Sequence, residues 1–281
     1  MDWREAFSQL AAQLAGGGVE TPVREAALIW EWVTSQSYSD WVVSGGTVAP
    51  DEFEAMRRTA VRRIQHEPWA YITGRREFFG MELTVTPDVL IPRPETEHLV
   101  EAVLAARPLD QQRLVDVGTG SGAIALAVAR ARPAWTVFGV DISPAALAVA
   151  RQNARRLNLA VTFQCSDLLC EVSGRFDVIA ANLPYVAQSE EVDPETEYEP
   201  DGALYADDHG LAIIARLIAA SPGWLAPGGQ LFLECGAAQA RAICQLLKDA
   251  GFSDLEVQQD LAGLDRVVAA AWRPGEGESN G

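Results

Sequence analysis

From Leu114 to Trp272, short apolar segments alternate with longer amphipathic ones, and this alternation restricts the possible folds more than any other feature of the chain. The apolar segments favour strands over 114–117, 135–141, 161–165, 176–181 and 230–235. Helical periodicity occupies 124–130, 143–157, 211–220 and 237–250 between or after them. Such a pattern predicts an α/β domain with a mostly parallel sheet. Two further apolar segments, 255–259 and 266–272, predict an antiparallel pair that closes the sheet.

The residues before this region have a different pattern. Apolar residues recur at helical spacing over 3–14, 22–33 and 51–65, which predicts a small helical domain. We expect four tryptophans to pack in its core, because apolar stripes on helices usually mean burial: Trp30, Trp32, Trp41 and Trp69. The β-prone segment 77–85 predicts a hairpin or short linker strands, and a helix is expected over 95–106.

These patterns divide the chain into four parts. Residues 1–73 form the helical domain, and residues 74–94 form a hairpin linker punctuated by Pro87, Pro92 and Pro94. Residues 95–273 form the α/β domain. The segment 274–281, rich in Gly, Ser and Glu, is expected to be a disordered tail.

The charge of the chain limits its partners. With 22 Lys and Arg against 39 Asp and Glu, the net charge is −17, which argues against a protein that neutralises the phosphates of duplex DNA. The sequence contains no run of about 18 apolar residues, so no membrane span is expected. The first residues lack the basic-then-apolar plan of a signal peptide. We therefore expect a cytoplasmic protein without a membrane or duplex-DNA partner.

Cysteine and histidine usage agrees with that location. The four cysteines are Cys165, Cys170, Cys235 and Cys244, and no two of them form a C-x-x-C pair. The three histidines are scattered, so no zinc or other metal site is expected. The thiols are expected to be reduced and mostly buried.

A glycine-rich loop stands between the first strand and the first helix of the α/β domain. It consists of Gly118, Thr119, Gly120, Ser121 and Gly122. Glycines at this place let the backbone turn tightly and let a ligand approach the main chain. Asp141, at the end of the next strand, is placed to accept the ribose hydroxyls of an adenosine. Asp167 is a candidate acceptor for the adenine amino group, with Leu168 covering the ring. Because the loop also fits a dinucleotide fingerprint, hydride transfer and methyl transfer both remain open here.

A tetrapeptide after the fourth strand separates these two chemistries. Asn182-Leu183-Pro184-Tyr185 follows segment 176–181, and ligands of open α/β sheets bind beyond the carboxyl ends of the strands. The similar sequence Asn-Pro-Pro-Tyr is typical of methyltransferases that use S-adenosylmethionine on amide or amino nitrogens conjugated to a π system. Leu183 is the one departure. It keeps the backbone carbonyl, and Pro184 still favours an extended residue 183, but the fixed φ of proline is lost.

The chemistry of an amide nitrogen explains these residue types. Its lone pair is delocalised, so it is a poor nucleophile. The side-chain oxygen of Asn182 and the carbonyl of Leu183 can accept from its two N–H groups, turn the lone pair toward the methyl group and stabilise the developing positive charge. Tyr185 supplies a flat wall for the planar substrate group. A plain turn is the alternative interpretation of the tetrapeptide taken alone.

Together these motifs resemble the HemK/PrmC family, the methyltransferases that act on glutamine in peptide chain release factors. The matching segments run in order through nearly the whole chain: 68–74, 77–80, 90–97 (Leu-Ile-Pro-Arg-Pro-Glu-Thr-Glu), 116–122, Asp141, 182–185, 199–204 and 208–211. The resemblance implies methylation of the side-chain amide of the glutamine in the Gly-Gly-Gln motif, and hence modulation of translation termination. It implies a helical bundle, a β-hairpin linker and a class I, Rossmann-like S-adenosylmethionine-dependent methyltransferase domain with an antiparallel C-terminal strand.

The resemblance also assigns roles by motif position. The cofactor contacts would be the loop 118–122, Asp141, Leu168 and Asn182, with Asp167 added from the reasoning above. Residues 182–185 would hold the substrate glutamine. Arg93 and Glu95 would shape the mouth of the site, although a structural ion pair or cap explains them equally well.

Other functions remain as alternatives. A DNA adenine methyltransferase, or another protein or small-molecule N-methyltransferase, would use the same tetrapeptide, but the net charge counts against DNA. A dinucleotide oxidoreductase would explain the glycine loop and leave the tetrapeptide unexplained. The helical domain could itself be a binding scaffold.

Overall fold

The computed structural model of the chain describes residues 1–106, 111–187, 189–190 and 192–274. The tail expected over 274–281 lies, from residue 275 on, outside the described residues. The chain forms two compact units. Met1–Gly74 and Asp193–Tyr198 make up the helical unit, and Arg75–Val192 and Glu199–Gly281 make up the sheet unit.

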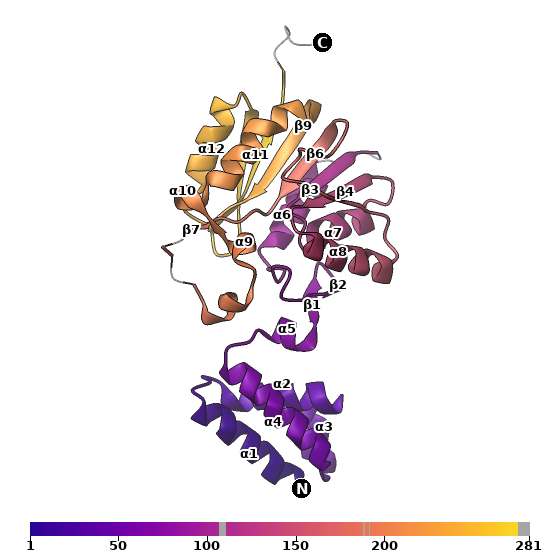
Figure 1. Ribbon diagram of the computed structural model, residues 1–281, viewed down its shortest axis with the longest axis vertical. Helices are drawn as coiled ribbons and strands as arrows, with labels where there is room; N and C mark the ends of the chain where they lie inside the picture. The colour runs from indigo at the N-terminus through magenta and orange to yellow at the C-terminus, as the bar shows by residue number, and fades with distance from the viewer. Residues whose placement is uncertain (107–110, 188, 191, 275–281) are drawn as a thin grey trace. The chain divides into compact units, whose positions relative to one another are not determined.

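The helical unit contains five α-helices (Figure 1): α1 Trp3–Gly16, α2 Pro22–Thr34, α3 Tyr38–Ser44, α4 Pro50–Ile64 and α5 Trp69–Thr73. The three long helices were predicted and are confirmed. The short α3 and α5 were missed, because seven and five residues are too few for a periodic signal. Proline opens α2 and α4, where the missing N–H costs nothing.

The core of the helical unit is aromatic and aliphatic. Phe7, Leu10, Ile29 and Met56 pack around a fully buried Trp30. Trp41 and Trp69 lie partly buried against the same cluster. The prediction for Trp32 was wrong, since 42% of this residue is exposed. Residues i and i+2 of a helix differ by about 200° around its axis, so Trp32 points away from the core when Trp30 points inward.

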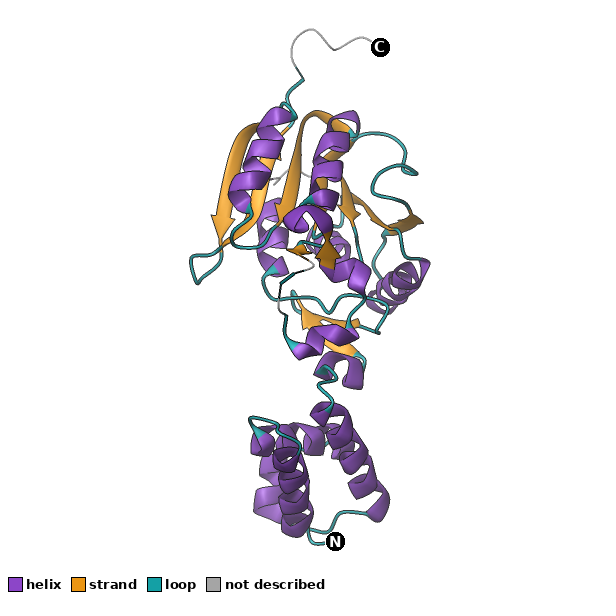
Figure 2. Cartoon of the chain, turned by 60° about the vertical axis from the view of Figure 1, so that its left-hand side comes forward, coloured by secondary structure: helices purple, strands orange, loops and turns teal. Residues whose placement is uncertain are grey.

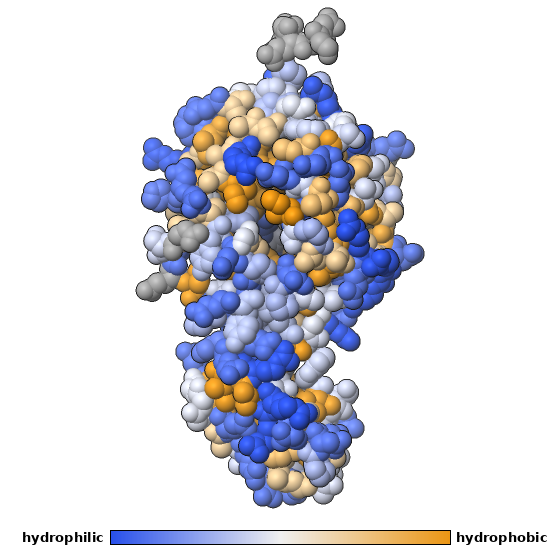
Figure 3. Space-filling view, in the orientation of Figure 1, coloured by the Kyte–Doolittle hydropathy of each residue, from blue (hydrophilic) through white to orange (hydrophobic). Residues whose placement is uncertain are grey.

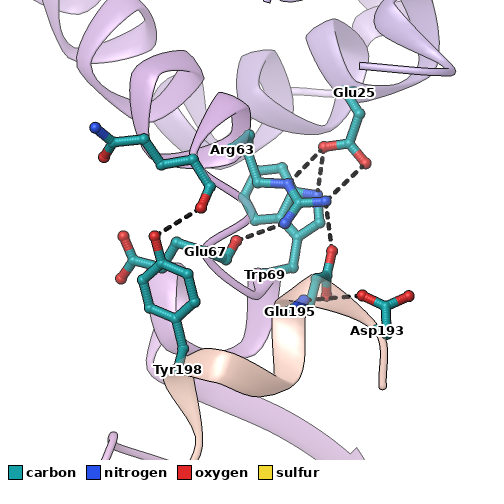
Figure 4. A network of polar contacts seen from close by, with 8 residues as sticks. Glu25, Arg63, Glu67, Trp69, Asp193, Glu195 and Tyr198 are labelled. Carbon is teal, nitrogen blue, oxygen red and sulfur yellow. Dashed lines mark hydrogen bonds and ion pairs between the residues drawn. The ribbon is translucent and has the colours of Figure 1, made fainter. Parts of the chain in front are cut away.

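Six residues from much later in the chain belong to the helical unit (Figure 4). They include the 3₁₀ helix η1, Pro194–Tyr198. The Arg63 guanidinium binds Glu25 at 3.0 Å and Glu195 at 2.9 Å, and the Trp69 indole donates to Glu25 at 3.0 Å. The hydroxyl of Tyr198 donates to the carbonyl of Gln65 at 2.7 Å. Segment 193–198 is therefore held on the helical unit by side-chain contacts.

The sheet unit begins with the predicted hairpin, β1 Arg75–Phe78 and β2 Met81–Thr84, which pair antiparallel. Its turn residues Phe79 and Gly80 both have positive φ, 48° and 65°, as a two-residue hairpin turn of type I′ requires. Helix α6, Thr96–Ala106, follows.

The large sheet has seven strands in the order β10-β11-β9-β6-β3-β4-β5. Their bounds are β3 Arg113–Val117, β4 Thr136–Asp141, β5 Thr162–Cys165, β6 Phe176–Ala181, β9 Leu225–Glu234, β10 Ser253–Gln259 and β11 Asp265–Ala271. The five strands from β9 to β5 are parallel, and β11 runs antiparallel to both β9 and β10. The alternation in the sequence predicted this arrangement, and it is confirmed.

Helices cover both faces of this sheet (Figures 1 and 2). One buried cluster joins the strands to α6, α7 (Ala123–Ala131) and α8 (Pro144–Leu157), and the other joins them to α11 (Ala212–Ala220) and α12 (Ala240–Asp249). Ser143 caps α8, accepting from the N–H of Ala146 at 3.2 Å. Neighbouring strand residues such as Leu114 and Val115 point into opposite clusters, as the pleat requires.

Shorter elements connect β6 to α11. They are β7 (Val186–Ala187), which pairs in parallel with β8 (Tyr205–Ala206), and the helical turns α9 (Asp201–Leu204) and α10 (Asp207–Gly210). The 3₁₀ helix η2, Ser221–Gly223, precedes β9. Among the helices of the described residues, none is both long enough and apolar enough to cross a membrane.

The expectation that the cysteine thiols are mostly buried was wrong. All four thiols are free, but Cys165 and Cys170 are exposed and only Cys235 is fully buried. Cys165 ends β5, which is an edge strand of the sheet, so it lacks a neighbouring strand on its outer side.

Candidate active site

The glycine loop turns sharply between β3 and α7. Gly118, Gly120 and Gly122 all have positive φ, at 73°, 53° and 85°, a conformation that residues with a Cβ rarely adopt. A Cβ at Gly118 would lie 2.9 Å from Cδ2 of Leu183, so this glycine also allows the tetrapeptide to pack against the loop. Apart from its chain neighbours, no atom of the described residues lies within 4 Å of a Cβ built at Gly120, which leaves the backbone there open to a ligand.

Asp116 holds this loop from beneath. Its side chain is fully buried, and Oδ2 accepts from the hydroxyl of Thr119 at 2.6 Å and from the N–H of Ala125 at 3.2 Å. Burial raises the pKa of Asp116 to about 7. The carboxyl thus links the loop to the first turn of α7. Sequence analysis gave Asp116 no role of its own, although an acid inside an apolar strand was a usable signal.

Asp141 supports the loop from the next strand. Oδ2 accepts from the N–H of Gly120 and Oδ1 from the N–H of Ser143, each at 2.9 Å. A carboxylate has about four lone-pair sites, so both oxygens retain acceptor capacity for hydroxyl groups.

A cavity of about 280 Å³ lies beyond the carboxyl ends of β3, β4 and β6. The structure brings eight of the predicted residues together in its wall: Gly118, Gly120, Asp141, Asp167, Leu168, Asn182, Leu183 and Pro184. Ile142, Arg216 and the segment 88–90 also line it, although none of them was predicted as a site residue. Ile142 carried a signal, because an apolar residue directly follows the acid that ends β4.

Some predicted residues lie outside the cavity wall. Thr119 and Ser121 are buried, and the hydroxyl of Thr119 points to Asp116. Gly122 packs against α7 and α8, since a Cβ there would lie 3.1 Å from Leu126 and 3.3 Å from Ala150. These three residues shape the loop, while Gly118 and Gly120 present it to the cavity.

The tetrapeptide continues directly from β6. Asn182 donates from Nδ2 to the hydroxyl of Thr96 at 3.0 Å, and Leu183 is buried with only 5% exposed. The carbonyl of Tyr185 accepts from the side-chain amide of Gln239 at 2.9 Å. Burial raises the pKa of the Tyr185 hydroxyl, which stays protonated near neutral pH.

Arg93 and Glu95 do not line the cavity. Arg93 forms an ion pair with the buried Glu199, whose other oxygen accepts from the N–H of Ile91 at 3.0 Å. This is the structural ion pair that sequence analysis kept as an alternative. Glu95 lies near Tyr185 and Glu234; burial is the main cause that raises the pKa of both groups, and the charge of Glu95 adds to it.

Asp167 is also paired. Its Oδ2 accepts from Arg216 at 2.7 Å, so the acid and the guanidinium both lie at the cavity wall. Within the described ranges, no three His, Cys, Asp or Glu side chains gather where they would hold a metal ion.

Comparison with known proteins decides the family. The PrmC N-terminal domain matches residues 5–74, and the methyltransferase small domain matches residues 94–197. A release factor glutamine methyltransferase of Bordetella pertussis is 41% identical over 257 residues, 88% of this chain and 93% of the relative. One of Yersinia pestis is 39% identical over 279 residues, 97% of this chain and 99% of the relative. The chain belongs to the release factor glutamine methyltransferase family. The HemK/PrmC resemblance is thereby confirmed.

Solved structures of other methyltransferases are similar to this chain in fold. A methyltransferase from Pyrococcus furiosus has a TM-score of 0.56 at 18% identity, covering 78% of this chain and 99% of its own. The 16S rRNA N2 G1207 methyltransferase of Thermus thermophilus, solved with AdoMet and guanosine, has a TM-score of 0.55 at 21% identity, covering 71% of this chain and 50% of its own. The sheet unit of this chain therefore has the predicted class I methyltransferase fold.

Proposed function

We propose that this chain transfers a methyl group from S-adenosylmethionine to the side-chain amide nitrogen of the glutamine in the Gly-Gly-Gln motif of peptide chain release factors, and so modulates translation termination. One observation carries the proposal: Asn182, Leu183 and Pro184 line the same cavity as Gly118, Gly120 and Asp141. The residues that we assign to the substrate amide and those that we assign to adenosine therefore line one cavity. Membership of the family supports the same substrate.

The residues of the cavity fit S-adenosylmethionine. Gly120 leaves its backbone open, and Asp141 has acceptor capacity for the two ribose hydroxyls. Ile142, 69% exposed, and Leu168 offer apolar surfaces for a flat base, and Asp167 lies beside Leu168 for its amino group. When bound, S-adenosylmethionine supplies a methyl group on a positively charged sulfur.

The tetrapeptide activates the substrate. We assign Asn182 Oδ1 and the carbonyl of Leu183 to the two N–H groups of the glutamine amide. Held by two acceptors, the amide nitrogen can be turned so that its lone pair faces the methyl group, and both acceptors stabilise the positive charge that develops. The cationic nitrogen then loses a proton readily, so the chain needs no strong base at this point. Tyr185 follows these residues but, like Arg93 and Glu95, does not line the cavity. We assign all three to the entrance, where the Tyr185 ring would give the planar amide a flat wall.

We assign residues 1–73 to docking of the release factor. On the helical unit, hydrophobic side chains lie among hydrophilic ones (Figure 3). The exposed large apolar residues of this unit include Val23, Leu28, Trp32, Val42, Val43 and Val61. Scattered apolar residues are common on surfaces, but Leu28 and Trp32 are four residues apart and share one face of α2. Trp32→Ala should therefore raise KM for intact release factor and leave kcat unchanged, as steady-state kinetics would show. An unchanged KM would remove this face from docking.

The substrate sets the location. Release factors act on the ribosome, so we place the enzyme in the cytoplasm, with no membrane or duplex-DNA partner. The net charge of −17 is consistent with a protein substrate and weighs against the alternative of DNA adenine methylation.

One experiment tests the function. The chain is incubated with methyl-labelled S-adenosylmethionine and purified release factor, and the label is mapped by mass spectrometry. A parallel reaction contains duplex DNA in place of release factor. We expect the label on the glutamine of the Gly-Gly-Gln motif and none on DNA. Label on DNA, with an unmodified release factor, would overturn the proposal.

A further inference from the structure

The side chain of Asn182 is held from behind by Thr96. Thr96 is the first residue of α6 and is 3% exposed. Its hydroxyl oxygen accepts from Asn182 Nδ2 at 3.0 Å, a contact between residues 86 positions apart. This bond determines which end of the amide faces the cavity, because an amide that donates backward from Nδ2 presents Oδ1 forward.

A buried carboxyl, that of Glu234, lies near this threonine. Glu234 is the last residue of β9, and the parallel register of Ala181 with Leu233 places it level with Asn182. Glu234 is 1% exposed, and neither carboxyl oxygen has a hydrogen-bond partner of good geometry among the described residues. The hydroxyls of Thr96 and Tyr185 face it, together with the charged groups of Glu95 and Arg266.

The donors and acceptors of these groups decide the direction of the hydrogen bonds between them. A threonine hydroxyl has one proton and two lone pairs, whereas an ionised carboxylate only accepts. With Glu234 ionised, the proton of Thr96 points to Glu234, and only lone pairs remain for Asn182. Asn182 must then turn its Nδ2 to Thr96. The opposite orientation would aim an NH₂ group at the substrate amide, where two donors would meet.

We propose that Thr96 and Glu234 are positioning residues for methyl transfer: Glu234 accepts the hydroxyl proton of Thr96, and Thr96 accepts from Asn182 Nδ2, so that Asn182 Oδ1 faces the substrate amide. This inference rests on the proposed function. Neither residue lines the cavity, so both act through Asn182.

Protonation of Glu234 reverses the direction. A neutral carboxyl can donate to Thr96, which then donates to Asn182 and turns its oxygen away from the substrate. Burial raises the pKa of Glu234 to about 7, so this change falls in an accessible pH range. Glu234→Gln cannot ionise and carries both a donor and an acceptor, as the protonated carboxyl does, so it imitates the protonated state at every pH.

Single-turnover methylation of release factor by the full chain tests the proposal. Thr96→Val should lower kcat about 10- to 100-fold with little change in KM, since a misdirected Asn182 costs part of the transition-state stabilisation. Thr96→Ser keeps the hydroxyl and should restore kcat. Ser221→Ala is the matched control, because it removes another buried hydroxyl, which donates to the carbonyl of Leu217 at 2.7 Å. Binding of S-adenosylhomocysteine and thermal unfolding check the fold of each variant.

The pH profile supplies a second measurement that a merely structural role would not change. Glu234→Gln should have a low kcat, and the ratio of parental to variant kcat should fall as the pH is lowered from about 8.5 to about 5.5. A parental kcat for Thr96→Val, or a ratio for Glu234→Gln that is constant with pH, would overturn the inference alone. If Thr96→Val fails to fold, the pH dependence of the ratio for Glu234→Gln tests the inference instead. A parent enzyme that leaves release factor unmodified would instead overturn the proposed function, and this inference with it.

Discussion

Arg63 of α4 forms an ion pair with Glu195, a residue 132 positions later, with 2.9 Å between Nη2 and Oε1 (Figure 4). Glu195 follows the tetrapeptide along the chain, on the connection between β7 and α9. The chain leaves the sheet unit after Val192, contributes Asp193–Tyr198 to the helical unit and returns at Glu199. The unit that we assign to docking therefore includes part of the connection that follows the residues we assign to substrate binding.

The two ion pairs of Arg63 should differ in strength. The side chains of Arg63 and Glu25 are 11% and 12% exposed, whereas Glu195 is 41% exposed. Arg63→Met leaves Glu25 without its cation and should lower the free energy of unfolding by about 2–4 kcal/mol. Glu195→Gln breaks a solvated pair and should cost about 0.2–1 kcal/mol. Urea unfolding measures both. Equal losses would mean that the interaction with Glu195 dominates.

Asp141→Ala should weaken cofactor binding by about 1.5–3 kcal/mol, the scale of hydrogen bonds to a charged group. The carboxylate also holds the N–H groups of Gly120 and Ser143, so the variant loses loop support together with the proposed ribose contact. Calorimetry with S-adenosylhomocysteine measures the change, and NAD serves as the control ligand that should not bind. Tight NAD binding without a response to S-adenosylhomocysteine would favour the oxidoreductase alternative.

Asp116→Asn should change how stability depends on pH. The pKa of Asp116 is about 7 in the folded protein, against an ordinary value of 3.8. Between these values the folded state keeps a proton that the unfolded state has lost. The stability that this group contributes is complete below pH 3.8 and is lost as the pH rises through about 7. Relative to Asp116→Asn, which cannot ionise, the parent should lose unfolding free energy over that range. Parallel stability curves would contradict the raised pKa.

Two kinds of feature were predictable from the sequence. They are the periodic helices and strands, and the site residues that stand at the carboxyl ends of strands. The alternation after Leu114 predicted the sheet, and parallel strands bring their carboxyl ends together, so Asp141 and Asn182 were expected to share a cavity. In contrast, Thr119 and Ser121 were assigned to the cofactor because the loop was treated as a unit. The positive φ of the three glycines turns alternate residues of the loop inward.

Contacts between distant, non-periodic positions were not predictable. Thr96 and Asn182 meet because α6 begins beside the ends of β6 and β9, which no local pattern of the sequence encodes. Glu195 stands in an acidic connection that resembles a solvated turn, and its pairing with Arg63 depends on how the helical unit folds. Such contacts need the tertiary arrangement of elements, whereas hydrophobic periodicity predicts only the elements.

Leu183→Pro separates the role of a backbone carbonyl from that of a side chain. Proline keeps the carbonyl at this position and fixes φ near −65°, so kcat should change by less than about 3-fold. The leucine is 5% exposed and packs in the core beside Gly118, so its loss should lower the free energy of unfolding by about 1–3 kcal/mol. Kinetics and urea unfolding of one preparation measure both effects. A large fall in kcat at unchanged stability would show that the leucine side chain itself serves the reaction.

Asn182→Ala should lower kcat about 10²–10³-fold, because the substrate nitrogen is then held by one acceptor and the other half of the transition-state stabilisation is lost. KM should change little, since Asn182 acts on the reacting nitrogen while docking energy comes from other surfaces. Asn182→Asp keeps an oxygen toward the cavity but loses the donor that binds Thr96, and it adds a negative charge near the buried Glu234. Its kcat should therefore fall as well, even where S-adenosylhomocysteine still binds. Single-turnover methylation of release factor by the three proteins compares these effects, and calorimetry confirms that each binds the cofactor product. An Asn182→Ala enzyme as fast as the parent would remove Asn182 from the mechanism, and with it the assignment of the tetrapeptide as the amide-binding element.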